Sequence, residues 1–112
     1  MNLHYYQTKS GKNAILEYID SLPVDERVDG YSVLKKLQDN ELEQVKFKRW
    51  EKKIYEVYFY KHNRIFYVTI DGDNMYLLHA CRKQKNKTEK KDKQIVITRA
   101  KELGNVLNRL FI

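Results

Sequence analysis

The stretch Ile54-Tyr55-Glu56-Val57-Tyr58-Phe59-Tyr60 is aromatic or β-branched at most of its positions, and this composition is typical of a β-strand. After a turn at residues 61–63, residues 64–70 have the same character and predict a second strand. The sequence Asp71-Gly72-Asp73-Asn74 is a strong hairpin turn, and residues 75–81 follow it as a third strand. Consecutive strands joined by short turns predict an antiparallel meander.

Two helices are predicted ahead of these strands. Apolar side chains recur at helical spacing over residues 14–22, and Pro23 ends that helix. A second helix runs roughly over residues 25–39, with a broad apolar face and a polar stretch at its end. The short connection between them predicts a helical hairpin. An extended segment within residues 3–8 predicts a short strand before the hairpin.

A third helix is predicted after the strands, with Thr88 as its N-cap and Gly104 at its end. The order of elements therefore predicts an α+β fold, in which the N-terminal helical hairpin covers one face of a small antiparallel meander sheet and a C-terminal helix follows. The length of 112 residues suits one domain spanning residues 1–112.

The opposite face of the predicted sheet is a candidate binding surface. Tyr58, Tyr60, Phe66 and Tyr67 lie on the strands, and basic residues lie at the strand ends, so we expect a concave aromatic and cationic surface. Aromatic rings stack on unpaired bases at about 1–3 kcal/mol each, which favours single-stranded RNA as the ligand. The competing interpretation is that these rings are half-buried residues of the sheet.

The net charge of +7 is distributed unevenly along the chain. Residues 1–45 carry a net charge of −3, whereas residues 82–93 alone carry +5. A basic second half joined to an acidic first half indicates a surface for a polyanion. The alternative is a lysine-rich surface that only aids solubility.

Cysteine and histidine usage argues against disulfides and metal. Cys81 is the single cysteine, so no internal disulfide can form, and the histidines are only His4, His62 and His79, so no structural zinc site is expected. No apolar run approaches the ~20 residues of a membrane span, and the N-terminus does not resemble a secretory signal. We therefore expect a cytoplasmic protein with no cofactor and no membrane partner.

Four segments, taken in their order and spacing, resemble the phage-related HigB branch of the RelE/ParE toxin superfamily. They are Lys53-Ile54-Tyr55-Glu56-Val57-Tyr58-Phe59, Asn63-Arg64-Ile65-Phe66-Tyr67, Leu77-Leu78-His79-Ala80-Cys81-Arg82-Lys83 and Lys85-Asn86-Lys87-Thr88-Glu89-Lys90-Lys91-Asp92. The resemblance covers about residues 45–103. It implies a RelE-like fold and the toxin of a type II toxin-antitoxin system. Such a toxin is an endoribonuclease that cuts mRNA in the ribosomal A site, and a HigA-like helix-turn-helix antitoxin neutralises it.

Three positions depart from the pattern of that family. Tyr58 stands where the family has arginine, Cys81 where it has phenylalanine, and Glu89 where it has proline. The first departure removes a cation from the expected site, so it bears directly on activity.

The implied reaction is attack of an RNA 2′-hydroxyl on the adjacent phosphate, and it needs no metal. It requires a proton acceptor, positive charge for the phosphorane and a donor for the leaving oxygen. Arg64, which matches the family's arginine, is predicted to bind the phosphate with its planar fork. Lys83 is the candidate base or electrostatic clamp, and Tyr58 the candidate proton donor or stacking ring. Further phosphate contacts are predicted for Lys52, Lys53, Arg82, Lys85 and Lys87.

Two expectations concern single side chains. Arg64 begins a strand after a polar turn, so its side chain is expected to reach solvent and its truncation to cost within about 1 kcal/mol of stability. His79 shares a face with Leu77 and Cys81 if the strand alternates regularly, and it is then a packed structural histidine.

Two other functions stay open at the level of the sequence. A ParE-like toxin shares the fold but inhibits DNA gyrase by binding, without cutting RNA. A non-catalytic basic module would bind nucleic acid with strong salt dependence and leave RNA intact.

Overall fold

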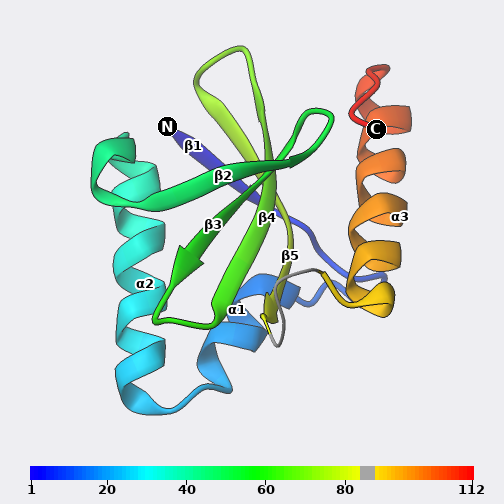
Figure 1. Ribbon diagram of the computed structural model, residues 1–112. Helices are drawn as coiled ribbons and strands as arrows, with labels where there is room; N and C mark the ends of the chain where they lie inside the picture. The colour runs from blue at the N-terminus through cyan, green and yellow to red at the C-terminus, as the bar shows by residue number, and fades with distance from the viewer. Residues whose placement is uncertain (84–87) are drawn as a thin grey trace.

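The computed structural model describes residues 1–83 and 88–112 (Figure 1). Within these ranges the elements are β1 (Asn2–Tyr5), α1 (Ala14–Asp20), α2 (Val24–Gln38), the 3-10 turn η1 (Leu42–Gln44), β2 (Lys46–Glu51), β3 (Ile54–Phe59), β4 (Asn63–Ile70), β5 (Asn74–Arg82) and α3 (Lys90–Leu107). The predicted α+β class is confirmed, with α1 and α2 before the meander and α3 after it. None of the helices in the described ranges has the length and apolar character needed to cross a membrane.

The strands of the described residues form one five-stranded sheet in the order β1-β5-β4-β3-β2. The meander β3-β4-β5 is antiparallel as predicted, and β2 extends it at one edge. At the other edge β1 pairs with β5 in parallel, with Leu3 opposite Met75. The prediction of a small antiparallel sheet is therefore wrong, because the sheet is wider and mixed. Sequence patterns miss β2 because its first four residues are all exposed, which removes the alternation typical of a strand.

α1 and α2 cover one face of the sheet. Asn13 caps α1 by accepting a hydrogen bond from the backbone N–H of Leu16 (3.0 Å). Pro23 stands just before α2, where a residue without a backbone N–H is tolerated. The buried side chains on this face come from both helices and from β3, β4 and β5, and include Ile15, Ile19, Leu34, Leu37, Val57, Phe59, Ile65, Tyr67 and Leu77.

Gly30 lets α2 approach β3 closely. A Cβ at this position would lie 2.9 Å from Cε2 of Phe59 and 3.1 Å from Cγ2 of Ile19. We expect Gly30→Ala to lower the free energy of unfolding by about 1–3 kcal/mol through overpacking, although alanine is the better helix former by roughly 1 kcal/mol at an open site. Urea denaturation measures the change, with Val28→Ala on the exposed side of α2 as the control. A more stable Gly30→Ala variant would contradict the close approach.

α3 covers part of the opposite face, and Figure 1 shows α2 and α3 on either side of the sheet. Val96 and Ala100 belong to a buried cluster with Phe66, Val68 and Leu78. The binding surface expected on this face is therefore smaller than predicted, because an apolar face of α3 packs on part of it.

Both ends of α3 differ from the prediction. Thr88 does not cap the helix, since it lies before the N-cap position and its hydroxyl accepts a hydrogen bond from Nε1 of Trp50 (2.9 Å). Gly104 lies inside the helix rather than at its end. Its carbonyl accepts a hydrogen bond from the N–H of Arg109 (2.9 Å), after Asn108 has adopted a left-handed conformation with φ 55°.

A β-bulge in β5 changes which side chains face α3. Phe66 pairs with His79, but Tyr67 pairs with Leu77, so Leu78 is an additional residue on β5. Leu77 consequently packs under α1 and α2, whereas the ring of His79 stacks on Phe66 on the α3 side, with 6.4 Å between ring centroids. Side chains do not alternate regularly along β5, so His79 and Leu77 lie on opposite faces of the sheet and not on the same face as expected. His79 is nevertheless packed, as predicted.

Candidate nucleic-acid interface

A cleft of about 480 Å³ opens at the end of β3, between α2, β2 and the residue after β5. We call it the lysine cleft. It is lined by Lys36, Lys46, Lys48, Lys61 and Lys83, and among the described residues Asp29 is the one acidic side chain in its lining. Tyr58 and Tyr60 form the aromatic part of the wall. Concentrated positive charge beside aromatic rings suits a polyanion with bases.

Three of these lysines converge on the ring of Tyr58. The ammonium nitrogen of Lys83 lies 5.3 Å from the ring centroid, and those of Lys46 and Lys48 each lie 5.9 Å from it. The pairing of β2 with β3 explains the positions of Lys46 and Lys48. Lys46 lies directly opposite Tyr58, and Lys48 is on the same face of β2 because residues two apart share a face of a strand. The N–H of Lys83 donates to the carbonyl of His62, which holds Lys83 against the turn between β3 and β4.

The hydroxyl of Tyr58 connects this cluster to a buried ion pair. Nη1 of Arg64 lies 2.9 Å from Oε2 of Glu56, and the two side chains are 3% and 1% exposed. Tyr58 donates its hydroxyl hydrogen to Oε1 of Glu56, and the ammonium nitrogen of Lys48 lies 3.7 Å from the same oxygen. One buried carboxylate thus organises a tyrosine, an arginine and a lysine.

Tyr58 is poorly suited to the role of general acid. Burial raises the pKa of Tyr58, and the hydrogen bond to Glu56 raises it further. Its hydroxyl therefore stays protonated at neutral pH and points its proton at a carboxylate inside the protein. The geometry favours Tyr58 as a supporting ring for the lysines over the proton donor that the sequence suggested.

The prediction that the side chain of Arg64 reaches solvent is wrong. Arg64 lies opposite Tyr58 on β3 and Cys81 on β5, so it stands in the interior of the sheet, and the residue is 2% exposed. Its Nε has no hydrogen-bond partner among the described residues. A guanidinium that is paired with Glu56 and shielded from water supports the cleft from inside the protein, and it is not free to bind a phosphate in this conformation.

The remaining predicted phosphate ligands lie outside the lysine cleft. Lys52 and Lys53 form the turn between β2 and β3, at the end of β3 far from Tyr58. Nη2 of Arg82 lies 2.8 Å from Oε1 of Glu26 on α2. A hydrogen bond from Asn63, together with Arg82, lowers the pKa of that carboxyl. Lys85 and Lys87 lie outside the described residues.

The predicted aromatic surface is smaller than expected. Phe66 is fully buried against Trp50, and Tyr67 is buried in the core under α1 and α2, where burial raises its pKa to about 12. Tyr60 is 40% exposed at the rim of the cleft. For Phe66 and Tyr67 the interpretation as buried sheet residues is confirmed, and Tyr58 and Tyr60 remain available to a ligand.

Sequence reasoning missed the lysines of β2 and α2 and the buried Glu56. Lys46 and Lys48 are two residues apart, which is the spacing of side chains on one face of a strand. This spacing indicates a place beside Tyr58 only once β2 is known to pair with β3. Glu56 carried a clearer signal, because an acidic residue inside an apolar strand needs a partner when it is buried.

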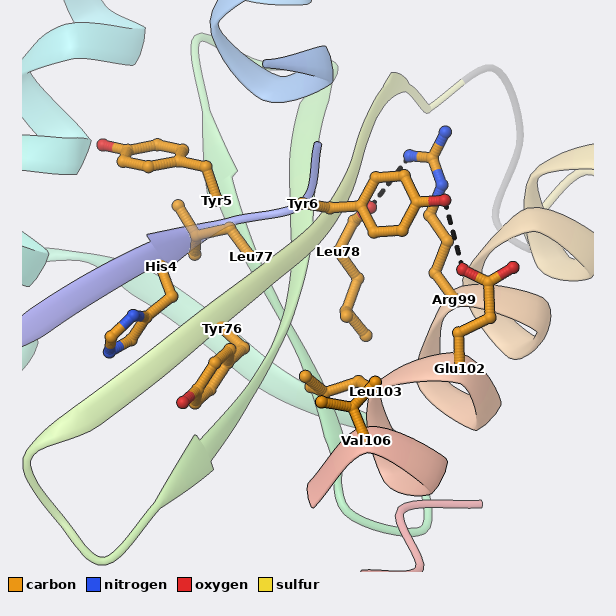
Figure 2. A pocket seen from close by; sticks show the side chains of 10 residues that line it. All are labelled: His4, Tyr5, Tyr6, Tyr76, Leu77, Leu78, Arg99, Glu102, Leu103 and Val106. Carbon is orange, nitrogen blue, oxygen red and sulfur yellow. Dashed lines mark hydrogen bonds between the residues drawn. The ribbon is translucent and has the colours of Figure 1, made fainter. Parts of the chain in front are cut away.

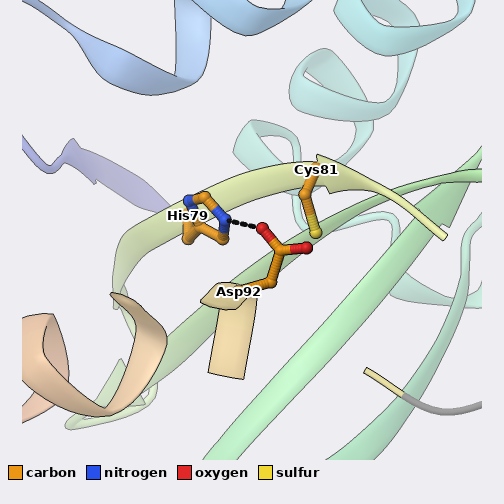
Figure 3. Close-up of side chains that lie close together, drawn as sticks. All are labelled: His79, Cys81 and Asp92. Carbon is orange, nitrogen blue, oxygen red and sulfur yellow. Dashed lines mark hydrogen bonds and ion pairs between the residues drawn. The ribbon is translucent and has the colours of Figure 1, made fainter. Parts of the chain in front are cut away.

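A separate cluster on the α3 side contains possible metal ligands. Atoms of His79, Cys81 and Asp92 lie within 4.8 Å of one another, and a ring nitrogen of His79 is 2.9 Å from Oδ1 of Asp92 (Figure 3). Burial lowers the pKa of His79, against the opposing effect of Asp92, and burial raises the pKa of Cys81 to about 12. Asp92, which follows His79 by 13 residues, meets His79 and Cys81 only in the folded protein, so the sequence pattern did not predict this cluster.

A second cavity of about 280 Å³ lies between β1, β5 and α3 (Figure 2). The guanidinium of Arg99 lies 4.1 Å from the ring centroid of Tyr6 and donates to the carbonyl of Leu78, while the hydroxyl of Tyr6 donates to Glu102. Most of the remaining lining is aromatic or aliphatic. This cavity is consequently a weaker candidate for a polyanion than the lysine cleft.

Comparison with known proteins identifies a family. The family model described as "Phage derived protein Gp49-like (DUF891)" matches residues 17–101, which span α2, the whole meander and most of α3. No curated protein matches the sequence.

Proposed function

Because the chain belongs to the Gp49-like family, a RelE/toxin-like family associated with toxin-like phage proteins, we propose that it is the toxin of a type II toxin-antitoxin system. The proposed activity is that of a HigB-type mRNA interferase with a RelE-like fold, which acts in the cytoplasm on mRNA in the ribosomal A site. The observation that carries this proposal is the convergence of Lys46, Lys48 and Lys83 on one tyrosine ring in an open, cationic cleft.

The proposed reaction is attack of the 2′-hydroxyl on the neighbouring phosphorus, with loss of the hydroxyl proton to water and departure of the 5′-oxygen, which takes up a proton from water. The negative charge of the phosphorane would be stabilised by the ammonium groups of Lys46, Lys48 and Lys83, which are held in place before the substrate arrives. Of the two roles that the sequence suggested for Lys83, we propose the electrostatic clamp, because its ammonium nitrogen lies closest to the ring of Tyr58 among the three. Arg64 and Glu56 are positioning residues, because they hold the Tyr58 hydroxyl and Lys48 from inside the sheet.

The proposed partner is a HigA-like antitoxin that presents acidic side chains to the lysine cleft. Complementary charge mainly increases the association rate, so association should slow as salt screens the lysines. Co-expression of the neighbouring gene product should relieve the growth arrest caused by the chain alone.

The decisive experiment is induction of the chain in a bacterium, followed by mapping of RNA ends. The expected result is growth arrest with new 5′ ends inside translated regions. Intact RNA combined with gyrase-dependent DNA breaks would instead identify a ParE-like toxin. Intact RNA and intact DNA, with salt-sensitive binding of either, would identify a non-catalytic binding module.

We predict that cleavage proceeds in the presence of EDTA and depends on the ribosome. The proposed chemistry uses lysine side chains and the 2′-hydroxyl, so it needs no divalent cation at the phosphate. Purified chain, mRNA and translating ribosomes, with the buffer magnesium adjusted after EDTA to keep ribosomes intact, provide the assay. Cleavage of naked RNA that disappears when EDTA is added would contradict both parts of this prediction.

A further inference from the structure

The cluster of His79, Cys81 and Asp92 joins two consecutive elements, β5 and α3. His79 and Cys81 come from the end of β5, where the bulge at Leu78 turns both toward α3, and Asp92 comes from the first turn of α3. Figure 3 shows the imidazole, the thiol and the carboxylate turned toward a common point. Cys81 and Asp92 are 6% and 7% exposed, and the side chain of His79 is 13% exposed.

The donor set fits one class of metal. An imidazole nitrogen, a thiolate and a single carboxylate match the ligands of Zn²⁺, whereas Mg²⁺ and Ca²⁺ prefer several oxygen ligands. Bonds of about 2.0–2.3 Å to a tetrahedral Zn²⁺ place ligand atoms about 3.5 Å apart. The three ligand atoms already lie within 4.8 Å of one another, so movements of about 1 Å close the site.

The charges also suit a divalent cation. Binding would release the thiol proton of Cys81 to solvent and form a Zn–S bond, and the resulting thiolate and the Asp92 carboxylate together balance the two positive charges. The His79–Asp92 hydrogen bond would give way to two bonds to the metal. The neighbouring cations act against this balance, since Arg64 lies opposite Cys81 and Arg99 and Lys91 lie near His79.

We propose that His79, Cys81 and Asp92 form a zinc-binding site that fastens the start of α3 to the end of β5. The site leaves a fourth coordination position for water. None of its three residues lines the lysine cleft, and the proposed role of the ion is to hold α3 against β5. This inference does not rest on the proposed function.

Titration of the full-length, chelator-treated chain with Zn²⁺ and with Co²⁺ tests the site. Isothermal calorimetry should give one Zn²⁺ per chain, and Co²⁺ should produce a thiolate-to-metal charge-transfer band in the near ultraviolet. The melting temperature should rise by roughly 10 °C when free Zn²⁺ reaches about a hundredfold excess over Kd. Absence of saturable binding, or a Co²⁺ complex without the charge-transfer band, would overturn the proposal even if every variant failed to fold.

Variants then assign the ligands. Cys81→Ser, His79→Gln and Asp92→Asn should each weaken Zn²⁺ binding at least tenfold, and Cys81→Ser should also remove the charge-transfer band. His62→Gln is the matched control, because His62 is an exposed histidine in the turn between β3 and β4, away from α3. If Cys81→Ser binds Zn²⁺ as tightly as the parent, or if His62→Gln weakens binding as much as His79→Gln does, the ligand assignment is wrong.

Discussion

Arg64→Ala is expected to lower the free energy of unfolding by about 3–5 kcal/mol, because it leaves the carboxylate of Glu56 buried without its main partner. Both side chains of this pair are almost completely shielded from water, so solvent cannot replace the lost guanidinium. The loss is a large fraction of the total stability of a typical domain, which is about 5–15 kcal/mol. Urea denaturation followed by circular dichroism measures it.

A double variant separates the buried charge from simple loss of packing. In Glu56→Met/Arg64→Met both charges are removed and the volume is kept, so we expect it to regain at least half of the stability lost in Arg64→Ala. Equal destabilisation of the single and double variants would mean that the ion pair has no special cost when broken. Loss of toxicity in Arg64→Ala has to be interpreted together with its measured free energy of unfolding, because an unfolded toxin is inactive whatever the role of Arg64.

Lys83→Ala is expected to reduce the rate of ribosome-dependent cleavage by about 100- to 1,000-fold, which corresponds to roughly 3–4 kcal/mol of transition-state stabilisation. The physical reason is that Lys83 is the cation nearest to the Tyr58 ring, in the cleft where the phosphorane charge would develop. Its side chain is partly exposed. The hydrogen bond from Lys83 to His62 is made by the backbone, so the alanine variant keeps it. The free energy of unfolding should therefore change by less than about 1 kcal/mol.

The control for Lys83→Ala is Lys52→Ala, which removes the same charge at an exposed turn outside the cleft. Cleavage rates with translating ribosomes and melting temperatures are measured for both variants. Lys52→Ala should cleave within about threefold of the parent, since an exposed charge farther than a Debye length is largely screened. If both variants lose activity equally, net charge rather than the geometry of the cleft determines the rate, and the assignment of Lys83 fails.

The meander and the helices could be predicted from the sequence because their signals are local. Residues 54–60, 64–70 and 75–81 are rich in aromatic and β-branched side chains, which predicts three strands. The turn at Asp71-Gly72-Asp73-Asn74 shows where the chain reverses between the last two. Helical spacing over residues 14–22 likewise needs only near neighbours. For these elements the sequence alone determined the type of secondary structure and the antiparallel order of the strands.

The candidate site could be predicted only in part. Tyr58 and Lys83 do come together, whereas Lys52, Lys53 and Arg82 lie elsewhere and Arg64 is buried. The lysines of β2 join the site through a pairing with β3 that a polar edge strand does not reveal in its own sequence.

The sequence by itself therefore determined an α+β chain with a basic second half, a helical hairpin, an antiparallel meander and a final helix. Only the tertiary structure decided which side chains face α3, which arginine is buried and which lysines share a cleft. The reason is that these properties depend on strand register, and a single additional residue at Leu78 moves His79 and Cys81 to the α3 side. Register arises from contacts between residues far apart in the sequence, so local patterns do not contain it.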